Sequence, residues 1–466
     1  MKHAIILSAG KGTRMNSELP KGAFMLIDKP MVVHAVDNLL NAGVLDINVV
    51  VGHLSEVIIE VLKDKEVSFS HQAVQSGTGS AVKCAKDHLY GKGGETIIVP
   101  SDMPLITPEI ISKLFEYHKG NNNDLTVLST YLDNPFSYGR IVRDNGNIKA
   151  IVEEKDASDE IKAIKEINSG VMVVSNKLLF DELDKLNNNN AKGEYYLTDL
   201  VMIMNNDGYK VGCYTTLDSE SLHGVNDRLM LSEVEEILED RIRNKHLLNG
   251  TTIKSPKSVI IGCDVQIGKD VTIEPNTVIY GKSTIGDYSI IGPNTEIDGS
   301  IIGKDTRIRH SLVKSSKVGD NTTVGPFAHL RDNAEIGDFN RIGNFVEVKN
   351  SKTGNTTKAS HLGYIGDAEI GSNVNFGCGA ITVNYDGKNK WKTVIEDNAF
   401  IGSNSNLIAP IKIEKDAYIA CGTTVNKNVP EGALAIGRSP QVTKEGYAEK
   451  IKARARQKAK EKEEDK

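Results

Sequence analysis

The sequence predicts an α/β domain with a mostly parallel sheet, followed by a parallel β-helix. Two observations support this prediction. In the first half, short apolar runs alternate with segments of helical spacing, as in layered α/β folds. In the second half, an aliphatic residue recurs at every sixth position, which is typical of a solenoid built from short strands. With 466 residues the chain is long enough for two or three domains with buried cores.

Five apolar runs in the first 227 residues have the length and composition of buried strands. They are HAIILSAG, INVVVGH, TIIVPSD, LTVLSTY and SGVMVVS, and several end in glycine, serine or aspartate. Between them, KPMVVHAVDNLLNAG and TGSAVKCAKDHLYG have helical spacing and stop at glycine. Because ligands of parallel sheets bind beyond the carboxyl ends of the strands, the polar residues that end these runs are site candidates.

A six-residue repeat organises the second half, after one amphipathic segment that predicts a connecting helix. The repeat shifts by one residue at Ile302 and Ile308 and then resumes. Its members are Ile261, Ile267, Ile273, Ile279, Ile285, Ile291 and Ile297, then Val318, Val324, Leu330, Ile336, Ile342 and Val348, then Ile395, Ile401, Leu407, Ile413, Ile419 and Val425. We therefore expect an α/β domain at 1–227, a linker helix at 228–250, a β-helix at 251–441 and a charged tail at 442–466.

The repeat is interrupted at SKTGNTTKASHLGYIG and at VNYDGKNKWKT. Insertions in a solenoid usually emerge as loops, and loops often carry function, so we expect two functional loops here. Periodicity alone leaves open that this domain is only a spacer or a trimerisation rod. The terminal stretch KEGYAEKIKARARQKAKEKEEDK has mixed charge and predicts a frayed helix or a solvated tail.

Composition restricts the function classes. The net charge of −6 gives no overall basic field that would attract nucleic acid or anionic lipid. The five cysteines, Cys84, Cys213, Cys263, Cys378 and Cys421, are widely spaced and lack a C-x-x-C pair, which argues against a disulfide framework or a zinc site. No segment approaches the ~20 apolar residues of a membrane span or the apolar core of a signal peptide. We expect a soluble protein of the reducing cytoplasm.

The stretch LSAGKGTRM, residues 7–15, follows the first apolar run. It matches neither the P-loop spacing G-x-x-x-x-G-K-[ST] nor the dinucleotide fingerprint G-x-G-x-x-G. Its glycines let backbone N–H groups approach an anion, and Lys11, Arg14 and Lys21 add positive charge. This turn suits a triphosphate. Taken alone, the stretch is also compatible with an ordinary strand-to-helix turn that binds no ligand. The role of Lys11 rests on charge alone.

Further motifs carry a family resemblance. LSAGKGTRM followed by Leu19-Pro20-Lys21 resembles the signature of sugar-1-phosphate nucleotidylyltransferases. QSGTGSA, PSDMPLI, YGRIV, IVEEKDA, EINSGV, GEYYLTD and GVNDR then occur in the order of the uridylyltransferase branch. The repeat half adds GPFAHLR, GNFVEVKN, SHLGYIGDAEIG, GCGAITVNYDG, IGSNSNLIAP and GTTVNKNVP. Over nearly its whole length the chain resembles the bifunctional N-acetylglucosamine-1-phosphate uridylyltransferase/glucosamine-1-phosphate N-acetyltransferase family.

For the first domain, the resemblance implies a Rossmann-like fold in which a sugar-1-phosphate oxygen attacks the α-phosphorus of UTP and releases pyrophosphate. Arg14 is then expected to hold the β- and γ-phosphates and Lys21 to stabilise charge at the α-phosphate. Asp102 and Asn226 match the family's Mg²⁺ ligands. The other implied contacts to UTP or to the N-acetyl sugar are Leu7, Ala9, Gly10, Gln72, Gly77, Thr78, Gly139, Glu153, Asn168, Tyr196 and Thr198.

For the second domain, the resemblance implies a left-handed, trimeric β-helix with a site shared between chains. There acetyl-CoA acetylates glucosamine-1-phosphate before the first domain activates the product, in a route to peptidoglycan, lipopolysaccharide or other cell-wall glycans. His361 is the candidate base, because imidazole titrates near neutrality. Glucosamine-1-phosphate is expected to contact Arg331, Lys349, Tyr364 and Asn375. Acetyl-CoA is expected to contact Cys378, Asn384, Tyr385, Ser403, Cys421 and Arg438, with the two cysteines as apolar wall residues and not as acetyl carriers.

Several positions depart from the usual family pattern and leave the exact sugar and the rates open. They are Gly22-Ala23-Phe24, Ser80, Ser101, Asp332-Asn333 and Gly363. Two rival functions also stay open. The β-helix of a one-activity nucleotidylyltransferase would only regulate or oligomerise, which leaves His361, Arg331 and Lys349 without a role. A noncatalytic hexapeptide scaffold would leave Arg14, Lys21, Asp102 and Asn226 without one.

Overall fold

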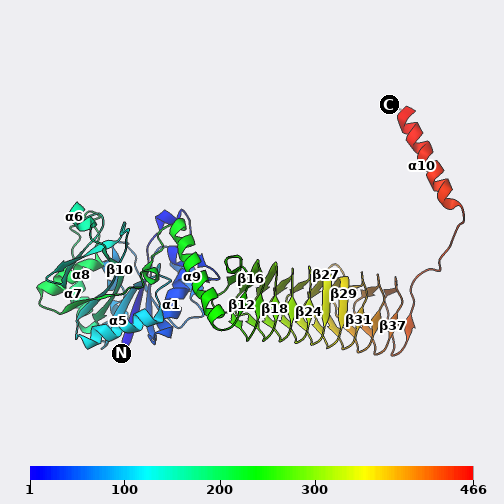
Figure 1. The fold of residues 1–466 in the computed structure, drawn as a ribbon, viewed down its shortest axis with the longest axis horizontal. Coiled ribbons are helices and arrows are strands. Elements are labelled where there is room, and N and C mark those ends of the chain that lie inside the picture. Colours follow the sequence, from blue (N-terminus) through cyan, green and yellow to red (C-terminus); the bar gives the residue numbers. More distant parts are fainter. Residues whose placement is uncertain (465–466) are drawn as a thin grey trace. The chain divides into compact units, whose positions relative to one another are not determined.

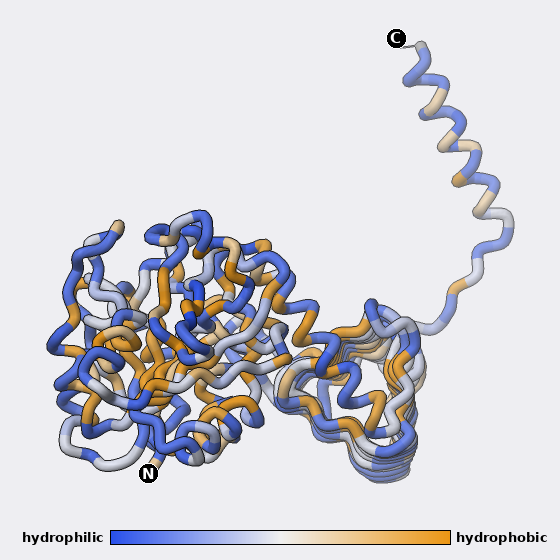
Figure 2. Tube along the Cα trace, turned by 60° about the vertical axis from the view of Figure 1, so that its left-hand side comes forward, coloured by the Kyte–Doolittle hydropathy of each residue, from blue (hydrophilic) through white to orange (hydrophobic). Residues whose placement is uncertain are grey.

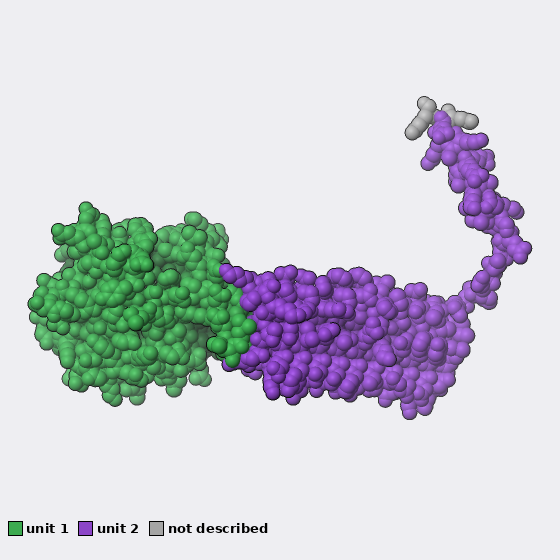
Figure 3. Space-filling model, in the orientation of Figure 1, with its two compact units in different colours: residues 1–248, 260–263 green, residues 249–259, 264–466 purple. Residues whose placement is uncertain are grey.

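The computed structural model describes residues 1–464 and divides the chain into two compact units (Figure 3). Unit 1 comprises residues 1–248 and 260–263, and unit 2 comprises 249–259 and the chain from 264 onward. Helix α9 (Arg228–Leu248) forms where the sequence predicts the connecting helix. Its Val234 is buried in one apolar cluster with Met15, Phe24 and Leu26, so the helix belongs to unit 1 by its packing.

Unit 1 is built on a nine-stranded sheet with the order β11-β7-β10-β6-β1-β4-β5, and the hairpin β8–β9 is attached to β10. Strand β1 pairs in parallel with β4 and β6, and β7 pairs in parallel with β11. Strand β10 runs antiparallel to β6 and β7. The strands are β1 (Lys2–Ser8), β4 (Asp46–Val51), β5 (Ser68–His71), β6 (Glu95–Pro100), β7 (Leu125–Tyr131), β8 (Gly139–Asp144), β9 (Asn147–Val152), β10 (Glu166–Ser175) and β11 (Val211–Thr215).

Helices cover both faces of this sheet (Figure 1). Successive strand residues point to opposite faces, so Ile5 and Ile6 of β1 belong to different apolar clusters. The α-helical residues of one cluster come from α1, α2 and α5, and those of the other come from α3, α4 (Lys86–Leu89), α7 and α8. These helices are α1 (Met31–Asn41), α2 (Ser55–Val61), α3 (Thr78–Lys83), α5 (Pro108–Gly120), α7 (Asn176–Leu183) and α8 (Leu200–Asn206).

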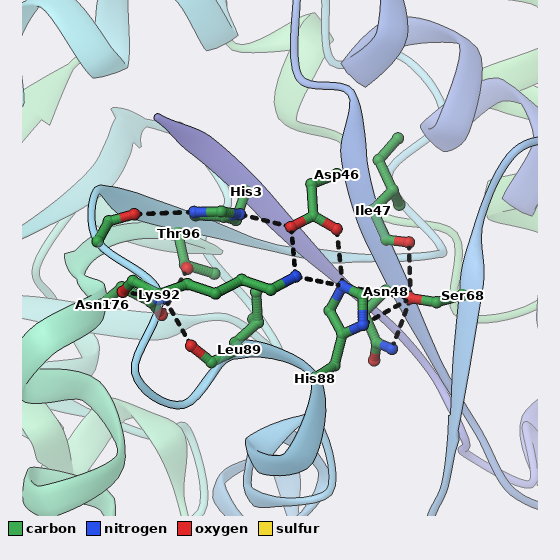
Figure 4. Close-up of polar contacts among 11 residues, drawn as sticks. His3, Asp46, Ile47, Asn48, Ser68, His88, Leu89, Lys92, Thr96 and Asn176 are labelled. Atoms are coloured by element: carbon green, nitrogen blue, oxygen red, sulfur yellow. Dashed lines mark hydrogen bonds and ion pairs between the residues drawn. The ribbon is translucent and has the colours of Figure 1, made fainter.

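A polar network joins the amino ends of β1 and β4 (Figure 4). The Asp46 carboxylate accepts hydrogen bonds from His3 Nδ1 at 2.7 Å, His88 Nε2 at 2.7 Å and Lys92 Nζ at 2.8 Å. His3 is fully buried, and its Nε2 lies 3.0 Å from the carbonyl oxygen of Gly93. Burial acts to raise the pKa of Asp46, but the hydrogen bonds from Lys92, His88 and His3 outweigh it and hold that pKa well below its ordinary value.

Unit 2 is a parallel β-helix of short strands, from β12 (Thr252–Ile253) to β39 (Leu434–Ala435) (Figure 1). Ile273 pairs in register with Ile291, 18 residues further along, so three six-residue repeats complete one coil. Ile279 and Ile297 stack in the same way on another side of the coil. All four side chains are fully buried. Figure 2 shows apolar stretches alternating with polar ones around the stacked coils. The predicted inward position is therefore confirmed for these four residues, whereas Ile267, near the start of the repeat, is only half-buried.

The one-residue shift of the repeat leaves the stack intact. Ile285 pairs with Ile302 and Ile291 with Ile308, each 17 residues apart, because a shortened turn brings the next aliphatic residue back into line. Val313 is buried and pairs with Ile297, so it continues the column of Ile279 and Ile297.

The two interruptions behave differently. The second emerges as a loop between β32 (Ile381–Val383) and β33 (Thr393–Ile395), as expected. The expectation of a loop is wrong for the first interruption, which continues the solenoid through β29 (Lys358–Gly366). This strand pairs along most of its length with β27 (Arg341–Lys349), so backbone hydrogen bonds hold it in the wall of the solenoid.

The charged tail contains helix α10 (Tyr447–Glu464). Its side chains are exposed from Tyr447 to Glu463.

Candidate active sites

A cavity of about 570 Å³ in unit 1 lies at the carboxyl ends of β1 and β6. The loop after β1 contributes Ala9 to Arg14 to its wall, and the turn after β6 contributes Ser101 and Asp102. Ligands of α/β sheets bind at this edge. The predicted residues that line the cavity are Leu7, Ala9, Gly10, Lys11, Arg14, Lys21, Gln72, Gly77, Thr78 and Asp102.

Four charged or amide groups meet beside this cavity. Lys21 Nζ forms an ion pair with Asp102 and donates a hydrogen bond to Asn226 Oδ1 at 3.0 Å. Arg14 Nη2 donates to the same Asn226 oxygen at 2.7 Å. The structure thus brings together all four residues that the sequence predicts for phosphate and metal binding.

The oxygens of Asp102 and Asn226 suit a hard divalent cation. Both contact a single ammonium group, that of Lys21, so both lie within reach of one positive charge. Two oxygen donors leave the other positions around Mg²⁺ to water or phosphate oxygens, which is how proteins usually hold this ion, so the pair fits Mg²⁺.

The residues predicted to hold the sugar form a second group, outside the lining of this cavity. Gly139 pairs with Asn168 between β8 and β10, and Thr198 Oγ1 donates to Glu153 Oε1 at 3.3 Å. Burial raises the pKa of Glu153, against an opposing effect of Lys192. Tyr196 is buried in the same segment as Thr198. The backbone N–H of the intervening Leu197 donates to Thr78 Oγ1 at 3.0 Å, which joins this group to the cavity wall.

In unit 2, His361 lies in β29, directly opposite Asn344 of β27. Its Nδ1 lies 3.0 Å from Asn344 Oδ1, and the imidazole is exposed. Because an amide oxygen only accepts, Nδ1 carries the proton of this hydrogen bond and Nε2 is left as the basic nitrogen of the neutral ring.

Two cationic residues lie on the coils that precede the strand of His361. Arg331 of β25 (His329–Arg331) pairs in register with Lys349 of β27. The Arg331 guanidinium lies 2.7 Å from both the Glu347 and the Asp332 carboxylates. Any phosphate that binds Arg331 therefore competes with two protein carboxylates.

Lys390 is a functional candidate that the sequence interpretation missed. It lies in the loop between β32 and β33, and its contact with the ammonium group of Lys349 lowers the pKa of Lys390. Two like charges that converge in this way suit a dianionic phosphate. The lysines of KNKWK in the second interruption were the available signal, but nothing in the sequence says which of them faces Lys349.

Three of the six predicted acetyl-CoA residues, Cys378, Ser403 and Cys421, lie on adjacent coils of the solenoid. The backbone N–H of Asn404 donates to the carbonyl of Cys378, and that of Gly422 donates to the carbonyl of Ser403. Positions 378, 403 and 421 therefore succeed one another in adjacent coils. Such a column offers an extended surface for a long ligand.

Asn384 and Tyr385 lie at the start of the loop. Asn384 is buried and donates to the Asp367 carboxylate, which also accepts from Asn350. Burial acts to raise the pKa of Asp367, but these two amide donors outweigh it and lower that pKa. Tyr385 is exposed and donates to the Gly387 carbonyl at 2.7 Å.

The remaining candidates are less constrained. Tyr364 lies in the same strand as His361 and pairs in register with Ile381, and Asn375 lies on the next coil and pairs with Phe400. Arg438 is exposed beyond β39, and no described residue forms a hydrogen bond or an ion pair with it.

Comparisons with known proteins account for both units. Residues 4–198 match the family described as MobA-like NTP transferase domain. Residues 264–299, 315–350 and 392–427 match the bacterial transferase hexapeptide family of six repeats. The protein "Bifunctional protein GlmU" of Acholeplasma laidlawii (strain PG-8A) is 50% identical over 96% of this chain and 97% of its own length.

Two further relatives agree. The GlmU of Geobacillus sp. (strain WCH70) is 49% identical over 97% of this chain and 98% of its own length. That of Clostridioides difficile (strain 630) is 50% identical over 96% of this chain and 97% of its own length. The chain belongs to the bifunctional GlmU family.

Membership of the GlmU family confirms the predicted fold class, a Rossmann-like nucleotidyltransferase domain followed by a left-handed parallel β-helix of hexapeptide repeats. It also confirms an enzyme with both nucleotidyltransferase and acyltransferase domains. The two rival functions, a single-activity enzyme and a noncatalytic scaffold, are therefore disfavoured. None of the described helices is both long and apolar enough to cross a bilayer.

Proposed function

We propose that this GlmU-family chain catalyses two consecutive reactions. The β-helix transfers acetyl from acetyl-CoA to the amine of glucosamine-1-phosphate. The α/β domain then transfers the uridylyl group of UTP to the N-acetylglucosamine-1-phosphate produced, with release of pyrophosphate. The product, UDP-N-acetylglucosamine, supplies the cell-wall glycans. The cytoplasm is the proposed compartment, where UTP and acetyl-CoA are available and the five free thiols stay reduced.

The observation that carries the first activity is the convergence of Arg14 and Lys21 on Asp102 and Asn226, from positions up to 212 residues apart in the chain. A sugar-phosphate oxygen forms a bond to the α-phosphorus, and the bond from that phosphorus to the leaving pyrophosphate oxygen breaks. Arg14 and Lys21 neutralise the two anions that meet, so this chain contributes mainly positioning and charge. Mg²⁺, held by Asp102 and Asn226, would add positive charge on the triphosphate when bound.

Base and sugar recognition is assigned to the remaining candidates of unit 1. The base lies against Gln72 and the Gly77-Thr78 turn, which line the cavity. The N-acetyl sugar lies against Glu153, Asn168 and Thr198.

For the second activity, Nε2 of His361 accepts a proton as the glucosamine amine attacks the thioester carbonyl. The new C–N bond forms, the C–S bond breaks, and coenzyme A leaves as the thiol. Arg331, Lys349 and Lys390 bind the phosphate of the sugar, and the column at Cys378, Ser403 and Cys421 supports acetyl-CoA.

We also propose that three chains assemble and share this second site. Phe327 and Phe345 stack on successive coils with ring centroids 5.4 Å apart, and each is 56% exposed. The exposed Leu362 follows on the next coil, immediately after His361. An apolar column of this kind beside the candidate base is suited to burial against a second copy of the chain.

The test incubates the purified full chain with glucosamine-1-phosphate, acetyl-CoA, UTP and Mg²⁺, and follows thiol and pyrophosphate separately. Both products are expected. Absence of thiol would contradict the acetyl transfer, and absence of pyrophosphate from added N-acetylglucosamine-1-phosphate would contradict the uridylyl transfer. Sedimentation measures the assembly, and a monomer at working concentration would contradict the shared site.

A further inference from the structure

The side-chain amide of Gln72 is held by two acceptors in the wall of the unit 1 cavity. Its Nε2 donates to the Gly77 carbonyl at 3.2 Å and to Ser80 Oγ at 2.7 Å. Gln72 is only 4% exposed, so these partners are not readily replaced by water. A primary amide nitrogen has two hydrogens, and both are used here.

The hydroxyl of Ser80 is itself fully bonded. It donates to the Gly77 carbonyl at 2.8 Å, and it accepts from Ser76 Oγ at 3.0 Å as well as from Gln72. A hydroxyl has one hydrogen and two lone pairs, so the three contacts complete its capacity. Its acceptor side is therefore turned toward Gln72.

The Gly77 carbonyl belongs to a rigid turn. Gly77 has φ of +120°, and a Cβ atom there would lie 2.5 Å from the backbone oxygen of Tyr195. The flanking backbone is tied down on both sides: Tyr195 N–H donates to Ser76 O and Gly79 N–H donates to Tyr195 O, each at 2.8 Å. The acceptor that Gln72 meets thus has a fixed position.

These contacts determine which end of the amide faces the ligand. The opposite orientation would place the Gln72 oxygen against the Gly77 carbonyl oxygen, two acceptors with no proton between them. Because both hydrogens of Nε2 are used in these bonds, Oε1 is the atom left to bind a ligand. No described residue donates a hydrogen bond to it. Gln72 lines the cavity, so this acceptor is available to a nucleobase.

Uracil and cytosine differ at the atom that such an acceptor reads. The ring nitrogen N3 of uracil carries a hydrogen and donates, whereas N3 of cytosine has a lone pair and accepts. With cytosine, Gln72 Oε1 and N3 would face each other as two acceptors, and neither would receive a hydrogen bond. Sites built to bond a substrate N–H discriminate strongly against analogues that lack it.

We propose that Ser80 is the positioning residue that fixes the amide of Gln72 with its oxygen toward the base, and so selects UTP over CTP. This inference rests on the proposed contact of Gln72 with the base. It gives a role to the position at which this chain departs from the family's usual histidine. Ser80 acts through Gln72 and needs no contact with the nucleotide.

The experiment compares kcat/KM for UTP and CTP, from pyrophosphate release with N-acetylglucosamine-1-phosphate, in the full-length protein. Ser80→Ala is expected to lower the UTP/CTP ratio by about tenfold, because one of the two contacts that orient the amide is lost. Ser80→Thr retains the hydroxyl and is expected to restore most of the ratio. Ser76→Ala is the matched control, since Ser76 donates to Ser80 but does not touch Gln72, and its ratio should stay within about twofold of the original.

A double-mutant cycle separates positioning from a general structural effect. In a Gln72→Ala background, Ser80→Ala is expected to leave the UTP/CTP ratio unchanged. An unchanged ratio in the single Ser80→Ala variant, or an equal loss with and without Gln72, would overturn the inference.

Calorimetric binding of UTP and CTP to each variant separates failure of the inference from failure of the proposed function. Preferential UTP binding that depends on Ser80, without pyrophosphate formation, would contradict the reaction and support the inference. A Gln72→Ala variant that keeps full UTP preference would overturn the inference while the reaction stands.

Discussion

The Nδ1 atom of His361 lies 3.0 Å from Oδ1 of Asn344, which is its register partner on the preceding coil. This contact fixes the tautomer that a general base needs, because the proton on Nδ1 leaves Nε2 free to accept one. The same relationship explains why the candidate base lies in a paired strand and not in a loop: pairing of β27 with β29 holds both partners at one level.

We expect Asn344→Ala to lower the rate of thiol release by about tenfold, because the imidazole loses the acceptor that orients it. Pyrophosphate formation from N-acetylglucosamine-1-phosphate should not change. Asn344→Asp retains an acceptor at the same place and should keep more activity than the alanine variant. Equal loss in the two variants would argue against an orienting role for the side-chain oxygen.

Removal of the base itself is expected to have a larger effect. His361→Ala should reduce thiol release by about 10²- to 10⁴-fold, the usual contribution of a general base, while pyrophosphate formation is spared. Both products are measured on one protein preparation. Parallel loss of the two would contradict separate sites.

The Asp102 carboxylate should govern the Mg²⁺ requirement of the first reaction. Asp102→Ala removes one of the two oxygens proposed for the metal, so we expect pyrophosphate formation to fall by at least about tenfold and to need more Mg²⁺ for half-maximal rate. A Mg²⁺ titration of pyrophosphate release measures this, with thiol release as the internal control. An unchanged Mg²⁺ dependence would place the metal elsewhere.

The two lysines near the second site predict a pH effect on sugar-phosphate binding. Because contact with Lys349 lowers the pKa of Lys390, Lys390 loses its charge at a lower pH than an ordinary lysine. The KM for glucosamine-1-phosphate should therefore rise at an alkaline pH below that expected for an isolated lysine. Lys349→Met should move the onset of the rise to higher pH, and an unmoved onset would contradict the coupling of the two groups.

The network around Asp46 predicts a pH dependence of stability. Its folded-state pKa is lowered, so its contribution is present above the ordinary aspartate pKa of about 4 and is lost as the pH falls below it. Asp46→Asn should destabilise β1 and β4 by about 1–3 kcal/mol at pH 7, and the difference from the original should shrink in acid.

Hydrogen exchange of peptides from β1 and β4 in the full chain measures this effect. Fluorescence does not suit it, because the single tryptophan, Trp391, lies in unit 2. The control is Lys63→Ala, which removes only an exposed pair with Glu60. Equal protection of β1 and β4 in Asp46→Asn at pH 7 would contradict the prediction.

Much of the fold followed from sequence because each coil must bury one aliphatic residue per side. Ile273 pairs with Ile291, and Ile285 still pairs with Ile302 although the spacing there is one residue shorter. The strand directions in the sheet of unit 1 were harder to predict from the sequence. SGVMVVS predicts a buried strand, but an apolar run carries no sign of direction, and β10 proves antiparallel to its neighbours.

The candidate site residues also divide into those that the sequence could predict and those that it could not. Arg14 lies in the loop after one apolar run and Asp102 ends another, so their position at one edge of the sheet was predictable, whereas the pairing of Asp102 with Asn226 came from the family resemblance. Asn344 and Lys390 were not, because their roles depend on which residue lies opposite or across a loop. The orientation of the Gln72 amide likewise required the Ser80 and Gly77 contacts.

The stacked register of the β-helix has a consequence for how such proteins change over generations. Ile267 meets Ile285, and Ile273 meets Ile291, through the same short turn and pairing, so neighbouring coils are interchangeable as building blocks. Duplication or loss of one complete coil on the amino-terminal side of β25 would lengthen or shorten the rod without disturbing His361 or its neighbours. The number of coils can thus change by whole units, while the residues of acetyl transfer remain in the same coils.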